Sequence, residues 1–113
     1  PSPVEGDEIT LVSFGAAARP TYKAVQLLRE KGVAANFLRL KTLWPMNDEA
    51  LRRRLEGSTH VFVVEMNLGQ LVREIERIVG HLGVSAHSVG KIGGVVHTSE
   101  EIVREVERVI KRS

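Results

Sequence analysis

The stretch that decides the fold is Val61 to Val79, VFVVEMNLGQLVREIERIV. It opens with an unbroken apolar run, Val61–Val64, which is too short for a helix core and rich in β-branched residues. Such a run predicts a strand buried on both faces, as in a parallel sheet. From residue 68 onward the apolar spacing becomes that of an amphipathic helix. The apolar stripe of this helix consists of Leu68, Leu71, Val72, Ile75, Ile78 and Val79.

The segments on either side repeat the same alternation of strand and helix. Further strands are predicted at Ile9–Phe14, Val33–Leu43 and Val84–Val89. Helices are predicted at Ala16–Lys31, with Tyr22, Ala24, Val25 and Leu28 as its apolar stripe, at Asp48–Leu55, and after Thr98, which forms a capping box with Glu101. Gly80–Gly83 is expected to close the helix of the organising stretch. The pattern βαβαβαβα predicts a parallel sheet with helices on both faces and right-handed crossovers.

The polarity of the strands predicts their order in the sheet. Ile9–Phe14 and His60–Glu65 are the most apolar and belong in the middle, whereas the other two strands belong at the edges. We therefore expect an α/β fold with three α/β/α layers and a mainly parallel sheet of about four strands in the order 2-1-3-4. Its switch point lies between strands one and three, where α/β proteins bind ligands and partners. The crevice there would be lined by Gly15, Ala16, Glu65, Met66 and Asn67.

The composition indicates an ordinary globular domain. The 113 residues are 42% apolar and 27% charged, and they are expected to form a single domain, 1–113, with residues 1–8 as a linker or lead-in strand. No apolar run approaches the ~20 residues of a membrane span. The absence of cysteine excludes disulfides and thiolate ligands and suits a cytoplasmic location. Because the chain opens Pro-Ser-Pro without methionine, we expect it to derive from a longer polypeptide.

Motifs for self-sufficient catalysis are absent from the sequence. Gly15 is not followed by the spaced glycines of a dinucleotide site, and no Walker loop or nucleophile elbow is found. The four histidines, His60, His81, His87 and His97, are scattered without a metal-ligand spacing, which favours structural or surface roles. We therefore predict no catalytic, cofactor-binding or metal-binding residue in this chain.

Several polar positions have two interpretations. Asn67 and Gln70 fit the N-cap and N3 positions of a capping box, and Glu65 suits the start of a helix. The same groups would also suit the binding of another domain or an anion. Arg52–Arg54 is interpreted first as a solvated helix face and second as a docking patch for an acidic partner. Trp44 either packs against the short helix or anchors an interface.

The residues of the organising stretch also carry a family resemblance. The run VVEMNLGQL at 63–71 closely resembles a motif in the α subunits of thiamine-diphosphate-dependent 2-oxoacid:ferredoxin oxidoreductases. LKTLWPM at 40–46 and KIGGVVHTSEEI at 91–102 are similar to two further family segments, and Ile9–Gly15 is similar to the family's first strand. The resemblance covers nearly the whole chain and corresponds to the C-terminal domain of that subunit, which is similar to the C-terminal domain of transketolases.

The resemblance implies a part of an enzyme that oxidatively decarboxylates a 2-oxoacid to acyl-CoA and reduces ferredoxin. It implies thiamine diphosphate, Mg²⁺ and iron–sulfur clusters in the full complex and none in this fragment. The implied partners are the pyrimidine-binding domain of the same subunit and the β subunit, with ferredoxin and coenzyme A for the full enzyme, and neither membrane nor nucleic acid. The residues transferred, as a docking or architectural motif, are Glu65, Asn67, Leu68, Gly69 and Gln70.

Two other functions are compatible with the residues. The first is a basic α/β RNA-binding accessory domain similar to an anticodon-binding domain, which the sequence pI of 9.3 allows. The net charge of only +2 and the few aromatic residues argue against it. The second is a plain dimerisation domain, which overlaps with an assembly role in the oxidoreductase.

Overall fold

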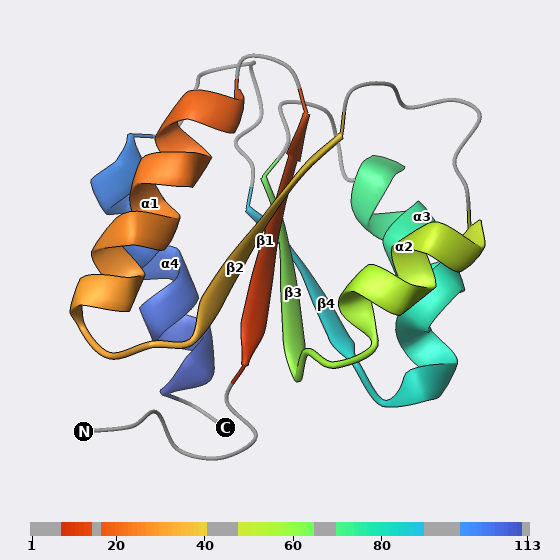
Figure 1. Ribbon diagram of the computed structural model, residues 1–113. Helices are drawn as coiled ribbons and strands as arrows, with labels where there is room; N and C mark the ends of the chain where they lie inside the picture. Colours follow the sequence, from red (N-terminus) through yellow and green to blue (C-terminus); the bar gives the residue numbers. More distant parts are fainter. Residues whose placement is uncertain (1–7, 15–16, 41–47, 65–69, 90–97, 112–113) are drawn as a thin grey trace.

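The computed structural model describes residues 8–14, 17–40, 48–64, 70–89 and 98–111. Strands and helices alternate along the chain (Figure 1). The strands are β1 (Ile9–Phe14), β2 (Ala35–Leu40), β3 (His60–Val64) and β4 (Ser85–Val89). The helices are α1 (Ala18–Glu30), α2 (Asp48–Leu55), α3 (Gln70–Val79) and α4 (Ser99–Ile110), with a short 3₁₀ turn, η2 (Gly80–Leu82).

The sheet confirms the predicted strand order. It runs β2-β1-β3-β4, and the three neighbouring pairs are parallel. The central pair aligns Ile9 with His60 and Ser13 with Val64. The two most apolar strands lie in the middle of the sheet, where helices pack on both of its faces.

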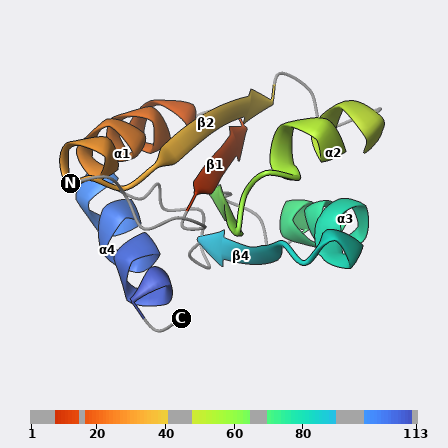
Figure 2. The ribbon, with the colours of Figure 1, turned by 60° about the horizontal axis from the view of Figure 1, so that its bottom comes forward.

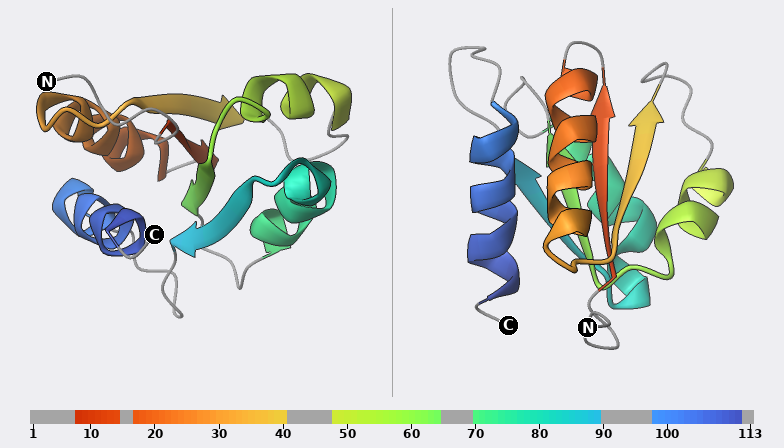
Figure 3. Two further views of the ribbon diagram at one scale, coloured as in Figure 1. Left: turned by 90° about the horizontal axis from the view of Figure 1, so that it is seen from below. Right: turned by 60° about the vertical axis from the view of Figure 1, so that its left-hand side comes forward.

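Two helices cover each face of the sheet, as Figures 1, 2 and 3 show. On one face α1 and α4 pack over a cluster centred on Phe62, Leu28 and Ile102. On the other face α2 and α3 pack over a cluster centred on Val63, Leu55 and Ile75. Alternate residues of β3 thus belong to opposite cores, and this explains why its sequence is continuously apolar rather than alternating.

The C-terminal end of α1 corrects the predicted start of the second strand. Gly32 adopts a φ of 87°, and the Val33 N–H donates to the Leu28 carbonyl at 3.0 Å. This left-handed closure uses Val33 to terminate the helix, so β2 begins at Ala35 and not at residue 33. β4 likewise begins at Ser85 and not at Val84, since the Ser85 N–H is the group that bonds to the Thr59 carbonyl of the neighbouring chain segment.

Gly80–Gly83 was expected to close α3, and this segment contains the 3₁₀ turn η2, which Gly83 follows with a φ of 79°. One further expectation is corrected. Tyr22 was expected on the apolar stripe of α1, but it is 51% exposed and packs edge-on against Phe37 of β2. Its place at the margin of the stripe and its polar hydroxyl explain this position. Ala24, Val25 and Leu28 are buried as predicted.

Candidate functional site

The candidate site is the edge of the sheet where β1 and β3 end. These strands are adjacent and parallel, so their carboxyl ends lie at the same edge. Both helices that follow them, α1 and α3, start at this edge, on opposite faces of the sheet (Figure 1). The predicted switch point between strands one and three is therefore present in the fold.

The predicted site residues themselves fall outside the described residues. This holds for Gly15 and Ala16, for Trp44, and for the segment 65–69 with Glu65, Met66, Asn67, Leu68 and Gly69. Gln70 is the first residue of α3, but its side chain is not described. Residues 15–16 and 65–69 each follow directly on one of two adjacent strands, so the fold starts both segments at the same edge of the sheet. Their roles remain predictions.

The Ser13 hydroxyl group, near the end of β1, has no hydrogen-bond partner among the described residues. Ser13 is fully buried, and its Oγ atom has no hydrogen-bond partner within the described part of the chain. Buried hydroxyl groups are rarely left without a partner, since each costs about 1–3 kcal/mol. The sequence analysis gave Ser13 no role, although a serine in a mostly apolar central strand was a signal.

The start of α1 also lacks a side-chain cap. The N-cap residue is Ala17, which has no polar side chain, and no acidic residue lies in the first turn. Thr21 does not compensate, because its Oγ1 donates to the Ala17 carbonyl at 2.6 Å. The first N–H groups of this helix are thus not satisfied by a neighbouring side chain at its N-cap. This polar helix start and Ser13 belong to neighbouring segments of one strand–helix unit.

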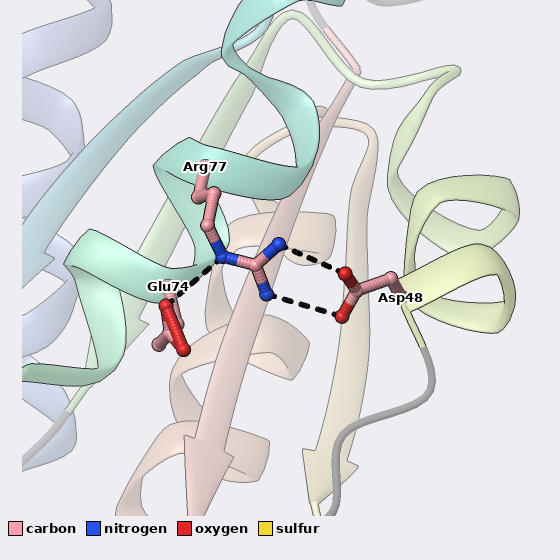
Figure 4. A network of polar contacts seen from close by, with 3 residues as sticks. All are labelled: Asp48, Glu74 and Arg77. Atoms are coloured by element: carbon pink, nitrogen blue, oxygen red, sulfur yellow. Dashed lines mark hydrogen bonds and ion pairs between the residues drawn. The ribbon is translucent and has the colours of Figure 1, made fainter.

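On the opposite face, an ion-pair network joins α2 to α3 (Figure 4). The Arg77 guanidinium donates to both carboxylate oxygens of Asp48, at 2.9 and 3.2 Å, and to Glu74 at 3.1 Å. The hydrogen bonds from Arg77 hold the pKa of Asp48 below its usual value, and those to Asp48 and Glu74 raise the pKa of Arg77. The Asp48 and Arg77 side chains are half exposed, so their ion pair contributes little to the stability of the fold.

Two of the histidines meet, which the sequence did not predict. His60 Nδ1 lies 3.0 Å from His87 Nε2, and the His87 ring stacks on Phe62 with centroids 5.0 Å apart. The register that pairs Phe62 with His87 creates this cluster, although the two histidines are far apart in sequence. Burial, followed by the nearby His60, lowers the pKa of His87. Within the described residues, no three His, Asp or Glu side chains gather as metal ligands.

These features define a class of protein: a doubly wound parallel α/β domain with a switch point between its central strands. No helix in the described part of the chain could cross a membrane. The family model described as pyruvate:ferredoxin oxidoreductase core domain II matches residues 7–102. The chain therefore belongs to the family of pyruvate:ferredoxin oxidoreductase core domain II.

The sequence is also similar to single subunits of two enzymes. The KorA subunit of 2-oxoglutarate synthase from Methanothermobacter thermautotrophicus is 39% identical over 98 residues, which cover 87% of this chain and 26% of the relative. The VorB subunit of ketoisovalerate oxidoreductase from Methanothermobacter marburgensis is 32% identical over 110 residues, covering 97% of this chain and 31% of the relative. The chain thus spans about a quarter to a third of the length of these relatives.

Solved structures share the fold. A 2-oxoglutarate:ferredoxin oxidoreductase from Magnetococcus marinus superposes with a TM-score of 0.75 at 22% identity, covering 96% of this chain and 19% of that chain. A split-gene transketolase superposes with a TM-score of 0.78 at 19% identity, covering 95% of this chain and 39% of that one. The alpha chain of a probable 2-oxoacid ferredoxin oxidoreductase from Thermoplasma acidophilum is 25% identical with a TM-score of 0.57, covering 97% and 94% of the two chains. The expected transketolase-like fold is confirmed.

Proposed function

We propose that this chain is the non-catalytic C-terminal domain of the α subunit of a thiamine-diphosphate-dependent 2-oxoacid:ferredoxin oxidoreductase. The match of residues 7–102 to core domain II carries the proposal, and similarity to KorA, to VorB and to subunit alpha of 2-oxoacid:ferredoxin oxidoreductase 2 from Aeropyrum pernix supports it. The whole enzyme would decarboxylate a 2-oxoacid oxidatively, form acyl-CoA and reduce ferredoxin. The entire stretch 1–113 would act as one transketolase C-terminal-like domain, in the cytoplasm.

The side chains of this domain do not suit the cofactors of such an enzyme. An iron–sulfur cluster is held by cysteine thiolates, and the chain contains no cysteine. The described residues also offer no group of three His, Asp or Glu side chains for a metal ion. We therefore assign thiamine diphosphate, Mg²⁺ and the clusters to other parts of the enzyme, and no catalytic step to residues of this chain.

The role that remains is assembly. The segment 65–70 follows directly on β3 at the edge where β1 and β3 end, and α1 starts there without a side-chain cap. Polar groups that a domain does not satisfy internally are suited to receive groups from another domain. We assign this edge to contact with the pyrimidine-binding domain of the same subunit or with the β subunit, with Glu65, Asn67 and Gln70 as the contacting residues.

The test compares variants in the assembled complex. Asn67→Ala and Gln70→Ala should weaken subunit association, measured by sedimentation at decreasing protein concentration, and lower turnover with it. Thr98→Ala is the matched control, because it breaks a cap of the same kind at the start of α4, which follows the outer strand β4 rather than the central strands β1 and β3. If the first two variants change only thermal stability, as the control should, residues 67 and 70 serve as a helix cap and the assembly role is wrong.

A second measurement tests the absence of a cofactor site. Calorimetric titration of the 113-residue chain with thiamine diphosphate and Mg²⁺ should show no saturable heat. Saturable binding would contradict the assignment of the cofactor to other parts of the enzyme. The two tests are independent, since the first concerns the switch-point edge and the second concerns the chain as a whole.

A further inference from the structure

The first turn of α1 and the carboxyl ends of β1 and β2 lie at one edge of the sheet, as Figure 3 (right) shows. Only residues 15–17 separate β1 from α1. Ala17 belongs to the core cluster on the α1 face, and the fully buried Thr21 hydroxyl donates to its carbonyl at 2.6 Å. The first turn of α1 therefore packs closely onto this end of the sheet.

Ser13 lies on the face of the sheet that α1 covers. Leu11, two positions earlier in β1, and Val64, the partner of Ser13 on β3, both belong to the core cluster beneath α1 and α4. Because alternate residues of a strand share a face, the Ser13 side chain points to the same side. Its Oγ is fully buried and has no hydrogen-bond partner within the described part of the chain. A buried hydroxyl of this kind indicates an acceptor that comes from outside the chain.

An arginine lies next to Ser13 on the same face. The register pairs Ser13 with Arg39 of β2. Phe37, two positions before Arg39, packs edge-on against Tyr22 of α1, so Arg39 also faces the α1 side. Neighbouring strands are about 4.8 Å apart, which lets the long arginine side chain reach over Ser13. Arg39 is exposed, and among the described residues no carboxylate partner is recorded for it.

The start of α1 is positively charged. Its N-cap, Ala17, offers no side-chain oxygen, and its first turn contains no acidic residue. The first turn instead carries Arg19, which is exposed and has no carboxylate partner in the part of the chain that the structure describes. A cation at this end opposes the helix dipole unless an anion lies beside it. The N–H groups of Ala18 and Arg19 are left for such an anion, since Pro20 has none.

The carboxylates at the start of α4, the helix that packs beside α1, are engaged in its own first turn. The Glu101 carboxylate accepts from the Thr98 N–H at 3.1 Å, and the Glu100 carboxylate accepts from the Ser99 hydroxyl at 3.1 Å. Neither group is recorded against the arginines of α1 and β2. The positive charge beside Ser13 is therefore not balanced from this neighbouring helix.

We propose that Ser13, Arg39 and the first turn of α1 bind a phosphate group. One oxygen accepts from Ser13 Oγ, others accept from the N–H groups of Ala18 and Arg19, and the Arg39 guanidinium approaches from the β2 side. Ser13 has no exposed surface, so it contacts the innermost oxygen, whereas the exposed arginine side chains contact the outer ones. A tetrahedral anion can meet donors from a strand, a helix start and a neighbouring strand at once, and a planar carboxylate cannot.

The experiment titrates the ¹⁵N-labelled 113-residue chain with inorganic phosphate, with sodium chloride holding the ionic strength constant. We expect saturable shifts of the Ala18 and Arg19 amides. Sodium acetate under the same conditions should give no saturable shift. Phenyl phosphate distinguishes the source of the group: binding as tight as that of free phosphate means that an organic phosphate fits, and exclusion means that free phosphate is the ligand. Either result supports the site, whereas the absence of saturable shifts with phosphate, or equal shifts with acetate, overturns the proposal.

Variants test the individual donors. Ser13→Ala and Arg39→Gln should each weaken phosphate binding by about tenfold, because each removes a hydrogen bond to the anion. Ser13→Ala keeps the Cβ and leaves no buried polar group behind, so the variant should remain folded. Arg104→Gln, at an exposed position of α4, is the matched control and should bind as the wild type does. If the first two variants bind phosphate as tightly as this control, the proposal is wrong and Ser13 is satisfied by water. The proposed function is tested separately, since Asn67 and Gln70 are unchanged here and no assembled complex is used.

Discussion

The Nδ1 atom of His60 and the Nε2 atom of His87 lie 3.0 Å apart, so two neighbouring strands share a histidine–histidine hydrogen bond. One ring nitrogen must donate and the other accept, which requires that at least one ring is neutral. The His87 ring also stacks on the fully buried Phe62. Protonation of both rings would replace this bond with a repulsion between like charges, beside an apolar surface.

This relationship predicts a loss of stability in mild acid. Burial and the neighbouring His60 lower the pKa of His87 in the folded chain, with Glu76 opposing the shift, so the unfolded chain binds the proton more tightly. The contribution of the neutral His87 ring to the free energy of unfolding is complete above pH 6.5 and is lost as the pH falls below that value. The thermal midpoint of the wild type should therefore fall more between pH 7.5 and 5.5 than that of His87→Phe. The corresponding difference in the free energy of unfolding should not exceed about 1 kcal/mol, because His87 is partly exposed. Parallel pH profiles would contradict this.

The Asp48–Arg77 pair should behave as an exposed contact. Arg77→Ala and Asp48→Ala should each lower the thermal midpoint slightly. The loss in the double variant should not exceed the sum of the two single losses, because both single variants remove the same bidentate contact. The effect should shrink in high salt. Ile75→Ala, a fully buried neighbour on α3, is the contrast and should cost about 2–5 kcal/mol whatever the salt concentration. A salt-independent loss in the Asp48 and Arg77 variants would show that the pair supports packing instead.

The contribution of the α4 capping box to the stability of the domain can be measured. The Glu101 N–H donates to Thr98 Oγ1, and the Thr98 N–H donates to Glu101 Oε1, both at 3.1 Å. Thr98→Ala should lower the free energy of unfolding by about 1 kcal/mol, measured by urea denaturation. Thr98→Ser keeps the hydroxyl and should lose much less. Equal losses in both variants would mean that the threonine methyl group, rather than the cap, is the stabilising part.

The fold was largely predictable because its signals are local. The run Val61–Val64 is apolar at consecutive positions, which only burial on both faces explains, and the polarity of the second strand placed it correctly at the margin. Thr98 and Glu101 marked the start of α4 through their spacing alone. Boundaries were less accurate, since Val33 looks like a strand residue and yet closes α1.

The contacts that depend on register were not predictable. His60 meets His87 only because β3 and β4 pair with Phe62 opposite His87, and one residue of slippage would separate them. The Thr10 and Ser58 hydroxyls, buried and 2.7 Å apart, are a second example, because they lie 48 positions apart in sequence. The switch point was predicted from topology. The lack of a partner for the Ser13 hydroxyl among the described residues was not predicted, because it depends on how the helices pack on the sheet.

Ser13 gives the last prediction, which concerns the stability of the domain itself. In the described part of the chain its buried Oγ has no partner, so Ser13→Ala removes a desolvated group while keeping the Cβ. In the 113-residue chain the substitution should raise the free energy of unfolding by about 1 kcal/mol in urea denaturation. Thr21→Ala is the control and should do the opposite, because its equally buried hydroxyl donates to the Ala17 carbonyl. Because Ser13 is fully buried within the domain, the same change should leave association in the assembled complex unaltered. A variant that is less stable on its own would show instead that Ser13 is already satisfied within the chain.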